Sequence, residues 1–151
     1  MPVLDRSVVT LRIAGDALEP AEVTSLLNCA PTFAQRKGDV HVGQKTGQRY
    51  VRKIGMWRLQ AEDKSPEDMN GQFMDILDKL PSDLSIWGGL SRRYEIDFFC
   101  GLFMKESNEG LEISPKVVAE MGKRGIQLSF DIYGPLGDDA AFDAPIVDTS
   151  I

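Results

Sequence analysis

Histidine and cysteine are scarce in this chain, and their scarcity excludes several kinds of site. The 151 residues include one histidine, His41, and two cysteines, Cys29 and Cys100. One imidazole and two scattered thiols cannot build a multi-histidine zinc or iron site, so we expect no metal and no cofactor. A Ser-His-Asp or Cys-His arrangement would need His41, which lies in a polar stretch flanked by glycine. The absence of a CxxC pair is typical of a reduced, cytoplasmic protein.

Long apolar runs and a basic excess are also missing. No window approaches the roughly 20 apolar residues of a membrane helix. The N-terminal MPVLDRSVV carries an acid and a base where a secretory signal would be apolar. The formal charge of -6 argues against a general nucleic-acid binder, which usually carries a basic face. We therefore expect a cytoplasmic protein without membrane or nucleic-acid partners.

The composition fits one folded domain with an uneven charge. An apolar fraction of 42% and a charged fraction of 26% are ordinary for a globular chain. Eight bases and three acids lie between Arg36 and Lys64, a local charge of +5 that leaves -11 for the remainder. Residues 134–151 hold four aspartates, two prolines and no base. We predict a single domain at 1–133 followed by an irregular acidic tail at 134–151.

Strands and helices are predicted to interleave. Period-two alternation predicts four strands, at 7–13, 50–61, 94–104 and 126–133. Start signals predict three helices, beginning near Pro20, Ser65-Pro66 and Ser114-Pro115. A polar, glycine-punctuated stretch predicts a hairpin near 41–50, and Gly88-Gly89 is expected to interrupt any regular element in 82–93. The order favours an α+β two-layer sandwich, with a ferredoxin-like βαββαβ core, a further helix and strand, and helices on one face of the sheet.

The densest apolar signal lies in the last two predicted strands and the helix between them. Four apolar residues share one face of each strand, and we expect both sets to be buried: Ile96, Phe98, Cys100 and Leu102, then Ile126, Leu128, Phe130 and Ile132. Val117, Val118 and Met121 of the intervening helix are expected to point inward, and Trp57 and Trp87 to lie in the core.

The succession of these segments resembles a known family. The stretches LRIAGDALEP, PTFAQRKGD, GMWRL, FFCGLF and GLEISPKVVAEMGKRGIQLSFDIY are similar to domain of unknown function 4279, a family of small uncharacterised bacterial proteins. The resemblance spans residues 11–133 and is most specific where a strand finishes in Asp131-Ile132-Tyr133. It implies a fold unit and a cytoplasmic setting, and it brings no activity, substrate or catalytic residue.

The outward residues of the four strands form the candidate binding site. They include bases, acids and aromatic rings: Arg12, Arg58, Asp97, Phe99, Phe103, Asp131 and Tyr133. Exposed aromatic rings among charges are typical of a ligand groove or a partner surface. Three interpretations stay open: cross-strand ion pairs without a binding role, a protein interface with a homodimer as the first choice, and a small-molecule pocket.

Three further patterns have plainer alternatives. Asp97 and Asp131 could serve as the acid and base of a hydrolase, although a strand aspartate opposite an arginine is more often a structural ion pair. GDVHVGQKT misses the phosphate-loop spacing by one residue and leads into a strand, so we reject it as a nucleotide site. The basic segment 36–53 could bind an anion or RNA, but only Tyr50 offers a stacking ring, and a solvated hairpin paired with the acidic tail is the alternative.

The sequence favours a non-catalytic protein-interaction module, either homodimeric or bound to a protein partner, of immunity or adaptor type. The reasons are the missing catalytic motif, the uneven charge and the outward aromatic residues. The alternative is a small-ligand-binding protein or enzyme that uses Arg58, Asp97, Asp131 and Tyr133 around a pocket.

Overall fold

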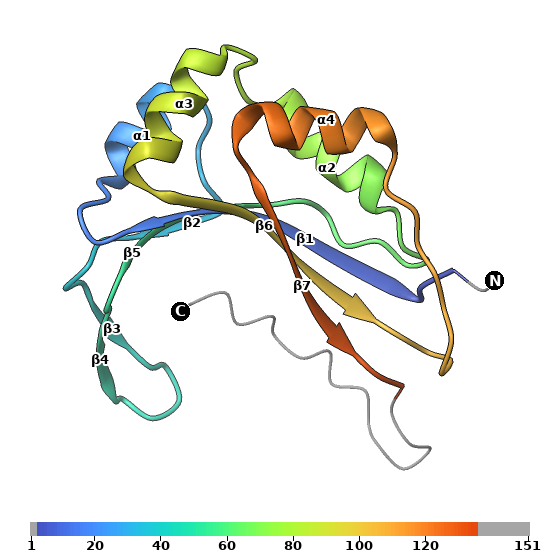
Figure 1. Ribbon diagram of the computed structural model, residues 1–151. Coiled ribbons are helices and arrows are strands. Elements are labelled where there is room, and N and C mark those ends of the chain that lie inside the picture. Colours follow the sequence, from blue (N-terminus) through green and yellow to red (C-terminus); the bar gives the residue numbers. More distant parts are fainter. Residues whose placement is uncertain (1–2, 136–151) are drawn as a thin grey trace.

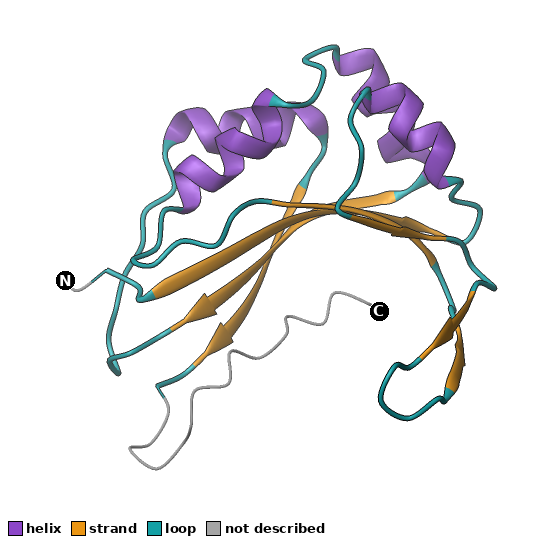
Figure 2. Cartoon of the chain, turned by 180° about the vertical axis from the view of Figure 1, so that it is seen from behind, coloured by secondary structure: helices purple, strands orange, loops and turns teal. Residues whose placement is uncertain are grey.

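One mixed sheet with helices on a single face organises the chain. The computed structural model describes residues 3–135, and its sheet has the strand order β2-β5-β1-β6-β7. Figures 1 and 2 show all four helices over the same face, so the predicted α+β class is confirmed. The predicted acidic tail, 134–151, lies outside the described residues except for Gly134 and Pro135.

The elements of the sheet and its helices follow in this order: β1 (Arg6–Gly15), α1 (Pro20–Leu27), β2 (Phe33–Gln35), β5 (Gly55–Gln60), α2 (Met69–Asp78), α3 (Leu84–Arg93), β6 (Glu95–Phe103), α4 (Pro115–Arg124) and β7 (Gln127–Tyr133). The central strand, β1, pairs antiparallel with β5 and β6, and β2 pairs antiparallel with β5. β7 runs parallel to β6 because α4 carries the chain back across the sheet before β7 begins.

A separate two-stranded ribbon interrupts the connection between β2 and β5. β3 (Val40–Val42) and β4 (Arg49–Val51) pair antiparallel and project beyond the main sheet (Figure 1). The predicted hairpin near 41–50 is therefore confirmed. The single strand predicted at 50–61 is wrong, because Arg52, Lys53 and Ile54 separate β4 from β5.

The core fills the space between the sheet and the helices. Val9, Leu11 and Ile13 of β1 are fully buried there, as their alternation predicts. Trp57 and Trp87 are also fully buried, and each indole N–H has a partner: the Thr24 hydroxyl at 3.0 Å and the Pro81 carbonyl at 2.8 Å. Burial of these rings therefore leaves no indole N–H unsatisfied.

Two helix predictions need correction. α2 begins at Met69, one turn after the predicted Ser65-Pro66, because the Asp68 side chain caps it by accepting a bond from the Gly71 N–H at 3.2 Å. Gly88-Gly89 was expected to interrupt any regular element, but it lies inside the continuous helix α3. Buried Trp87 and Leu90 hold this helix against the core, and that packing outweighs the low helix propensity of glycine.

The last helix and strand are less buried than the alternation suggests. Val117 and Met121 of α4 are buried as predicted, but Val118 is exposed. Phe130 and Ile132 of β7 were expected in the core and are instead 44% and 61% exposed. β7 is an edge strand of the sheet, and the described helices leave these two side chains uncovered.

Candidate functional site

The seven predicted site residues lie on the face of the sheet opposite the helices, which we call the second face. Arg12 at the centre of β1 is opposite both Arg58 of β5 and Asp97 of β6. Phe103 of β6 lies beside Tyr133 of β7. The remaining two, Phe99 and Asp131, share this face by the same alternation. The strand pairing therefore brings all seven residues to one face, across β1, β5, β6 and β7.

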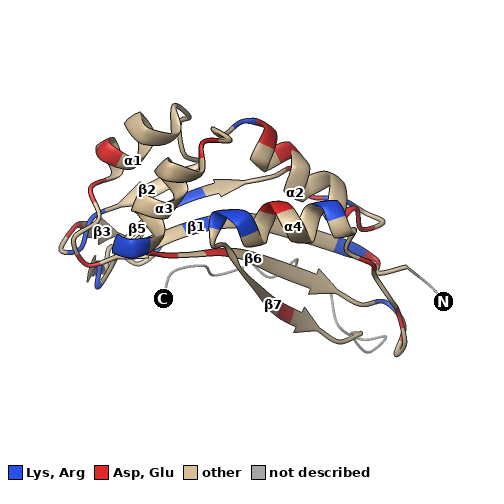
Figure 3. Ribbon diagram, turned by 45° about the horizontal axis from the view of Figure 1, so that its top comes forward, with Lys and Arg blue, Asp and Glu red and all other residues tan. Residues whose placement is uncertain are grey.

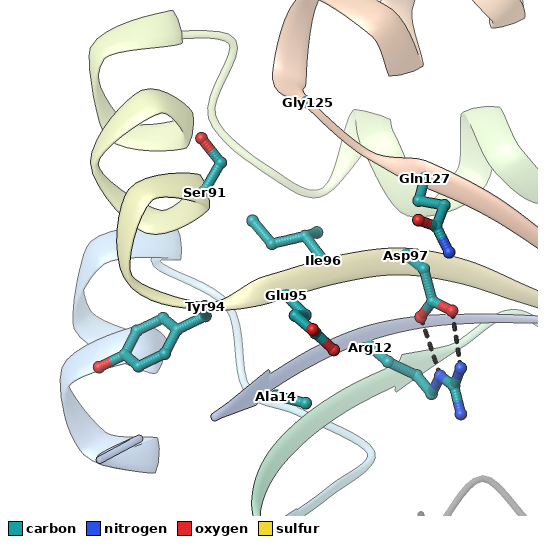
Figure 4. A pocket seen from close by; sticks show the side chains of 9 residues that line it. All are labelled: Arg12, Ala14, Ser91, Tyr94, Glu95, Ile96, Asp97, Gly125 and Gln127. Atoms are coloured by element: carbon teal, nitrogen blue, oxygen red, sulfur yellow. Dashed lines mark hydrogen bonds and ion pairs between the residues drawn. The ribbon is translucent and has the colours of Figure 1, made fainter. Parts of the chain in front are cut away.

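Arg12 and Asp97 form the strongest electrostatic contact on the second face. The Arg12 Nε and one terminal nitrogen donate to the two carboxylate oxygens of Asp97 at 2.8 and 2.6 Å (Figure 4). The side chains are only 12% and 14% exposed, so the pair is shielded from solvent. The Arg12 guanidinium also lies 4.3 Å from the centre of the Phe99 ring. This fork is the geometry of a structural ion pair, in which both carboxylate oxygens of Asp97 are engaged.

A second group of contacts joins β6 to β7. The rings of Phe103 and Tyr133 stack with their centres 4.8 Å apart and their planes 4° from parallel. Phe103 is only 2% exposed, so the expectation that it presents an open aromatic ring is wrong. The Tyr133 hydroxyl donates to the Asp131 carboxylate at 2.6 Å. That bond to the carboxylate, with a smaller effect of burial, raises the pKa of Tyr133 above its ordinary value.

Asp97 and Asp131 do not form a pair of catalytic carboxylates. Asp97 is in register with Gln127, and Asp131 follows four residues further along β7. Four residues of a strand correspond to roughly 13 Å, well beyond the spacing of paired catalytic carboxylates. Each aspartate also has its own partner, Arg12 for Asp97 and Tyr133 for Asp131. The hydrolase interpretation therefore loses its geometric basis.

A cavity of about 400 Å³ opens where β6 and β7 begin, near the ends of α3 and α4 (Figure 4). Its polar lining includes Ser91, Glu95 and Gln127, with Arg12 and Asp97 at one side. Of the four residues expected around a pocket, only Asp97 is present. The alternation of the strands could not reveal Ser91, because this residue comes from a helix that the sequence did not predict.

Two further surfaces expose apolar side chains, one on the hairpin within the basic segment 36–53 and one at the edge of the sheet. All six strand residues of the β3–β4 hairpin are exposed, and four of them are large and apolar: Val40, Val42, Tyr50 and Val51. Figure 3 shows basic segments at the β3–β5 end of the molecule, beside acidic ones. The outer edge of β7, with Phe130 and Ile132, is the second surface. Both surfaces expose apolar side chains, in a hairpin whose sequence is mainly polar and in a strand whose alternation predicts burial.

The described residues hold no recognisable metal or membrane element. Within 3–135, no group of three or more histidine, cysteine or carboxylate side chains could hold a metal ion. Among the helices described, none is long and apolar enough to cross a membrane. The two cysteines are unpaired thiols, one partly exposed and one buried.

The fold and the site together define a class of protein. It is an α+β domain with helices on one face of its sheet and paired charges and rings on the other. Within this class, the chain belongs to the family called domain of unknown function (DUF4279), whose model matches residues 5–135. No curated protein and no solved structure matched in the other two comparisons.

Proposed function

We propose that this chain is a non-catalytic protein-interaction module that binds a protein partner through the β3–β4 hairpin. The observation that carries the proposal is the exposure of every strand residue of this hairpin, four of them large and apolar. An exposed apolar cluster of this kind on a projecting element is typical of a binding surface.

The hairpin is held firmly at its base. The Gly38 N–H donates to the Arg52 carbonyl, and the Arg52 N–H donates to the Asp39 carbonyl, both at 2.7 Å. An isolated two-stranded hairpin is marginally stable in water, so these bonds and the attachment to β2 and β5 hold it in place. Val40, Val42 and Val51 share one face of the ribbon, because residues that pair across strands point to the same side.

Charge indicates an acidic partner. Lys45, Arg49 and Lys53 lie on or beside the hairpin, and no described acid lies within ion-pair distance of them. Bases of this kind at the rim of an apolar patch steer an acidic surface toward it. Three exposed valines contribute little to a phosphate backbone, so the combination favours a protein over a nucleic acid.

A paired affinity experiment tests the proposal. Wild-type protein and a Val40→Asp/Val51→Asp variant serve as baits in native lysate, followed by mass spectrometry. A Leu84→Asp variant is the matched control, because Leu84 is also an exposed apolar residue but lies on α3. We expect an acidic protein to be retained by the wild type and the control and lost from the hairpin variant. Identical retention by all three baits would contradict the proposal.

A small polar ligand is the second candidate function. The cavity beside Arg12 and Asp97 has a size that suits a small molecule and a lining with several hydrogen-bonding groups. Screening of polar metabolites by thermal shift, with Glu95→Ala as the comparison, tests it. A ligand that stabilises the wild type but not Glu95→Ala would support binding in this cavity.

We also propose that the fold has a ferredoxin-like core, which the order of the strands supports. β2-β5-β1-β6, with antiparallel neighbours throughout, is the order expected of a ferredoxin-like βαββαβ unit, and α4 with β7 would be its extension.

Two unpaired cysteines and the family resemblance support a cytoplasmic, bacterial setting. An immunity or adaptor role, in which the chain masks its partner, is the specific form of the function that we propose.

A further inference from the structure

The outer edge of β7 carries an interface of its own, independent of the hairpin. We infer that β7 pairs antiparallel with β7 of a second copy of this chain, in a register centred on Phe130, and joins the two sheets into one.

The backbone of β7 presents alternate residues to this edge. The Tyr133 carbonyl accepts a bond from the Met104 N–H at 2.9 Å, so the backbone groups of Tyr133 point toward β6. The N–H and C=O of a strand residue point to the same side and alternate along the strand. Leu128, Phe130 and Ile132 therefore point their backbone groups away from β6. Within 3–135, no backbone group bonds to them on that side.

The side chains leave the same edge unprotected. Natural edge strands are usually short or carry lysine, proline or a bulge that prevents further pairing. β7 is seven residues long and contains no lysine, arginine or proline. Its only charge, Asp131, lies on the second face and accepts the Tyr133 hydroxyl. Nothing within β7 itself opposes the addition of another strand.

The sequence of β7 is compatible with itself when the strand is reversed about Phe130. In that register Phe130 faces Phe130 of the second copy, and Leu128 faces the second copy's Ile132. Ser129 faces Asp131, so the single carboxylate meets a hydroxyl and not another carboxylate. Apolar residues thus meet apolar residues on the helix-covered face, and no like charges oppose each other directly.

Backbone geometry selects this register from its neighbours. A centre at Ser129 or Asp131 would make that residue a non-hydrogen-bonded pair and would leave Ile132 or Leu128, respectively, opposite a residue outside β7, so only about four bonds would form. A centre at Asp131 would also place two carboxylates directly opposite each other. A centre at Phe130 makes hydrogen-bonded pairs of all three outward residues, about six bonds in total. A centre at Leu128 or Ile132 would leave part of the strand without a partner. The self-matching sequence also favours a second copy over a foreign strand, which would need no such symmetry.

Light scattering tests the interface. We expect wild-type protein to show twice the mass of the 16.7 kDa chain, and Ile132→Lys to show the mass of one chain. Ile132 is exposed in the single chain, so a lysine there should leave the fold intact. Val51→Lys is the matched control, because Val51 is 63% exposed but lies on the hairpin, and it should remain dimeric. A monomeric wild type at high concentration, or a dimeric Ile132→Lys, would overturn the inference.

Cross-linking tests the register. In a Cys29→Ser background, Phe130→Cys places two thiols on the two-fold axis, with paired Cα atoms about 5.5 Å apart, a distance that a disulfide can span. With oxidised glutathione as the oxidant, we expect a covalent dimer. Ser129→Cys should stay uncrosslinked, because residue 129 faces residue 131 of the second copy. Cross-linking of Ser129→Cys in place of Phe130→Cys would overturn the register, even if Ile132→Lys altered folding.

Discussion

β6 and β7 carry the same apolar alternation in sequence but differ in burial. Their residues lie side by side in the sheet, Cys100 next to Phe130 and Leu102 next to Ile132. Cys100 and Leu102 are almost completely buried, whereas Phe130 and Ile132 are exposed. β6 has a strand on each side, and β7 has one only on its inner side among the described residues. Alternation therefore determines which side chains share a face, while the position of the strand determines whether that face is covered.

Asp97 of β6 and Asp131 of β7 also differ in where their hydrogen-bond partners come from. Asp97 of β6 is bound by Arg12 from the neighbouring strand, across the sheet. Asp131 of β7 is bound by Tyr133, two residues further along its own strand. The aspartate of the inner strand thus obtains its partner from a neighbouring strand, and the aspartate of the outer strand obtains its partner from its own strand.

Removing one aromatic ring from each strand should give the largest difference. We expect Phe98→Ala to lower the free energy of unfolding by about 3–5 kcal/mol, because the fully buried ring leaves a cavity beside Phe73. Phe130→Ala should cost about 1 kcal/mol in the single chain, since its ring is half exposed. Urea unfolding at low protein concentration measures both. Equal losses for the two variants would contradict the burial difference.

Thiol chemistry should separate the two strands next. Burial, with a smaller effect of the Asp97 charge, raises the pKa of Cys100 from 9.0 to about 12. At pH 8 the reactive thiolate of Cys100 should be about a thousandfold rarer than that of an ordinary thiol. In a Cys29→Ser background, Ile132→Cys should react rapidly with Ellman's reagent, and Cys100 only after unfolding in urea. Rapid reaction of Cys100 in the folded protein would contradict its burial.

Neutralising the two aspartates should give a smaller difference. Asp97→Asn leaves the Arg12 guanidinium without its carboxylate in a shielded site, and we expect a loss of about 1–3 kcal/mol. Asp131→Asn removes only a contact within one strand and should cost less than about 1 kcal/mol. Thermal unfolding of the two variants compares them. A larger loss of stability for Asp131→Asn than for Asp97→Asn would contradict the expectation that the contact of the inner strand stabilises the fold more.

The smallest effect concerns the titration of Tyr133. Because its pKa is raised in the folded chain, this tyrosine contributes stability that is fully present below its unfolded value near 10. That contribution is lost as the pH rises through the raised folded value. Absorbance titration of tyrosinate should show a lower Tyr133 pKa in Asp131→Asn, and Tyr133→Phe should identify the signal. An unchanged titration in Asp131→Asn would contradict the role of the carboxylate.

Local sequence signals were sufficient to predict a helix where the sequence carries the residues that begin and end it. Ser114 caps α4 by accepting from the Val117 N–H, and Gly125 ends it with a φ of 69°, where glycine is favoured. The face shared by Arg12, Asp97 and Tyr133 was also predictable, because alternation is a local property of each strand.

Features that depend on distant packing were not predictable. α3 persists through Gly88-Gly89 because Trp87 and Leu90 are buried by other elements. The exposure of Phe130 depends on the order of strands in the sheet, which alternation does not encode. The cavity collects Ser91, Glu95 and Gln127 from three elements that are separate in sequence. The sequence therefore predicted which residues form an element and share a face better than it predicted which other elements pack against them.

The β3–β4 hairpin has a consequence for how this fold can diversify. β2 and β5 are already antiparallel neighbours, and the Gln35 amide bonds to the Ile54 carbonyl at 2.9 Å to close the base of the inserted ribbon. A short turn between β2 and β5 would be enough to connect these two strands in the same sheet. The arm is thus structurally separate from the sheet, and its length and sequence can change while the sheet and its core stay constant.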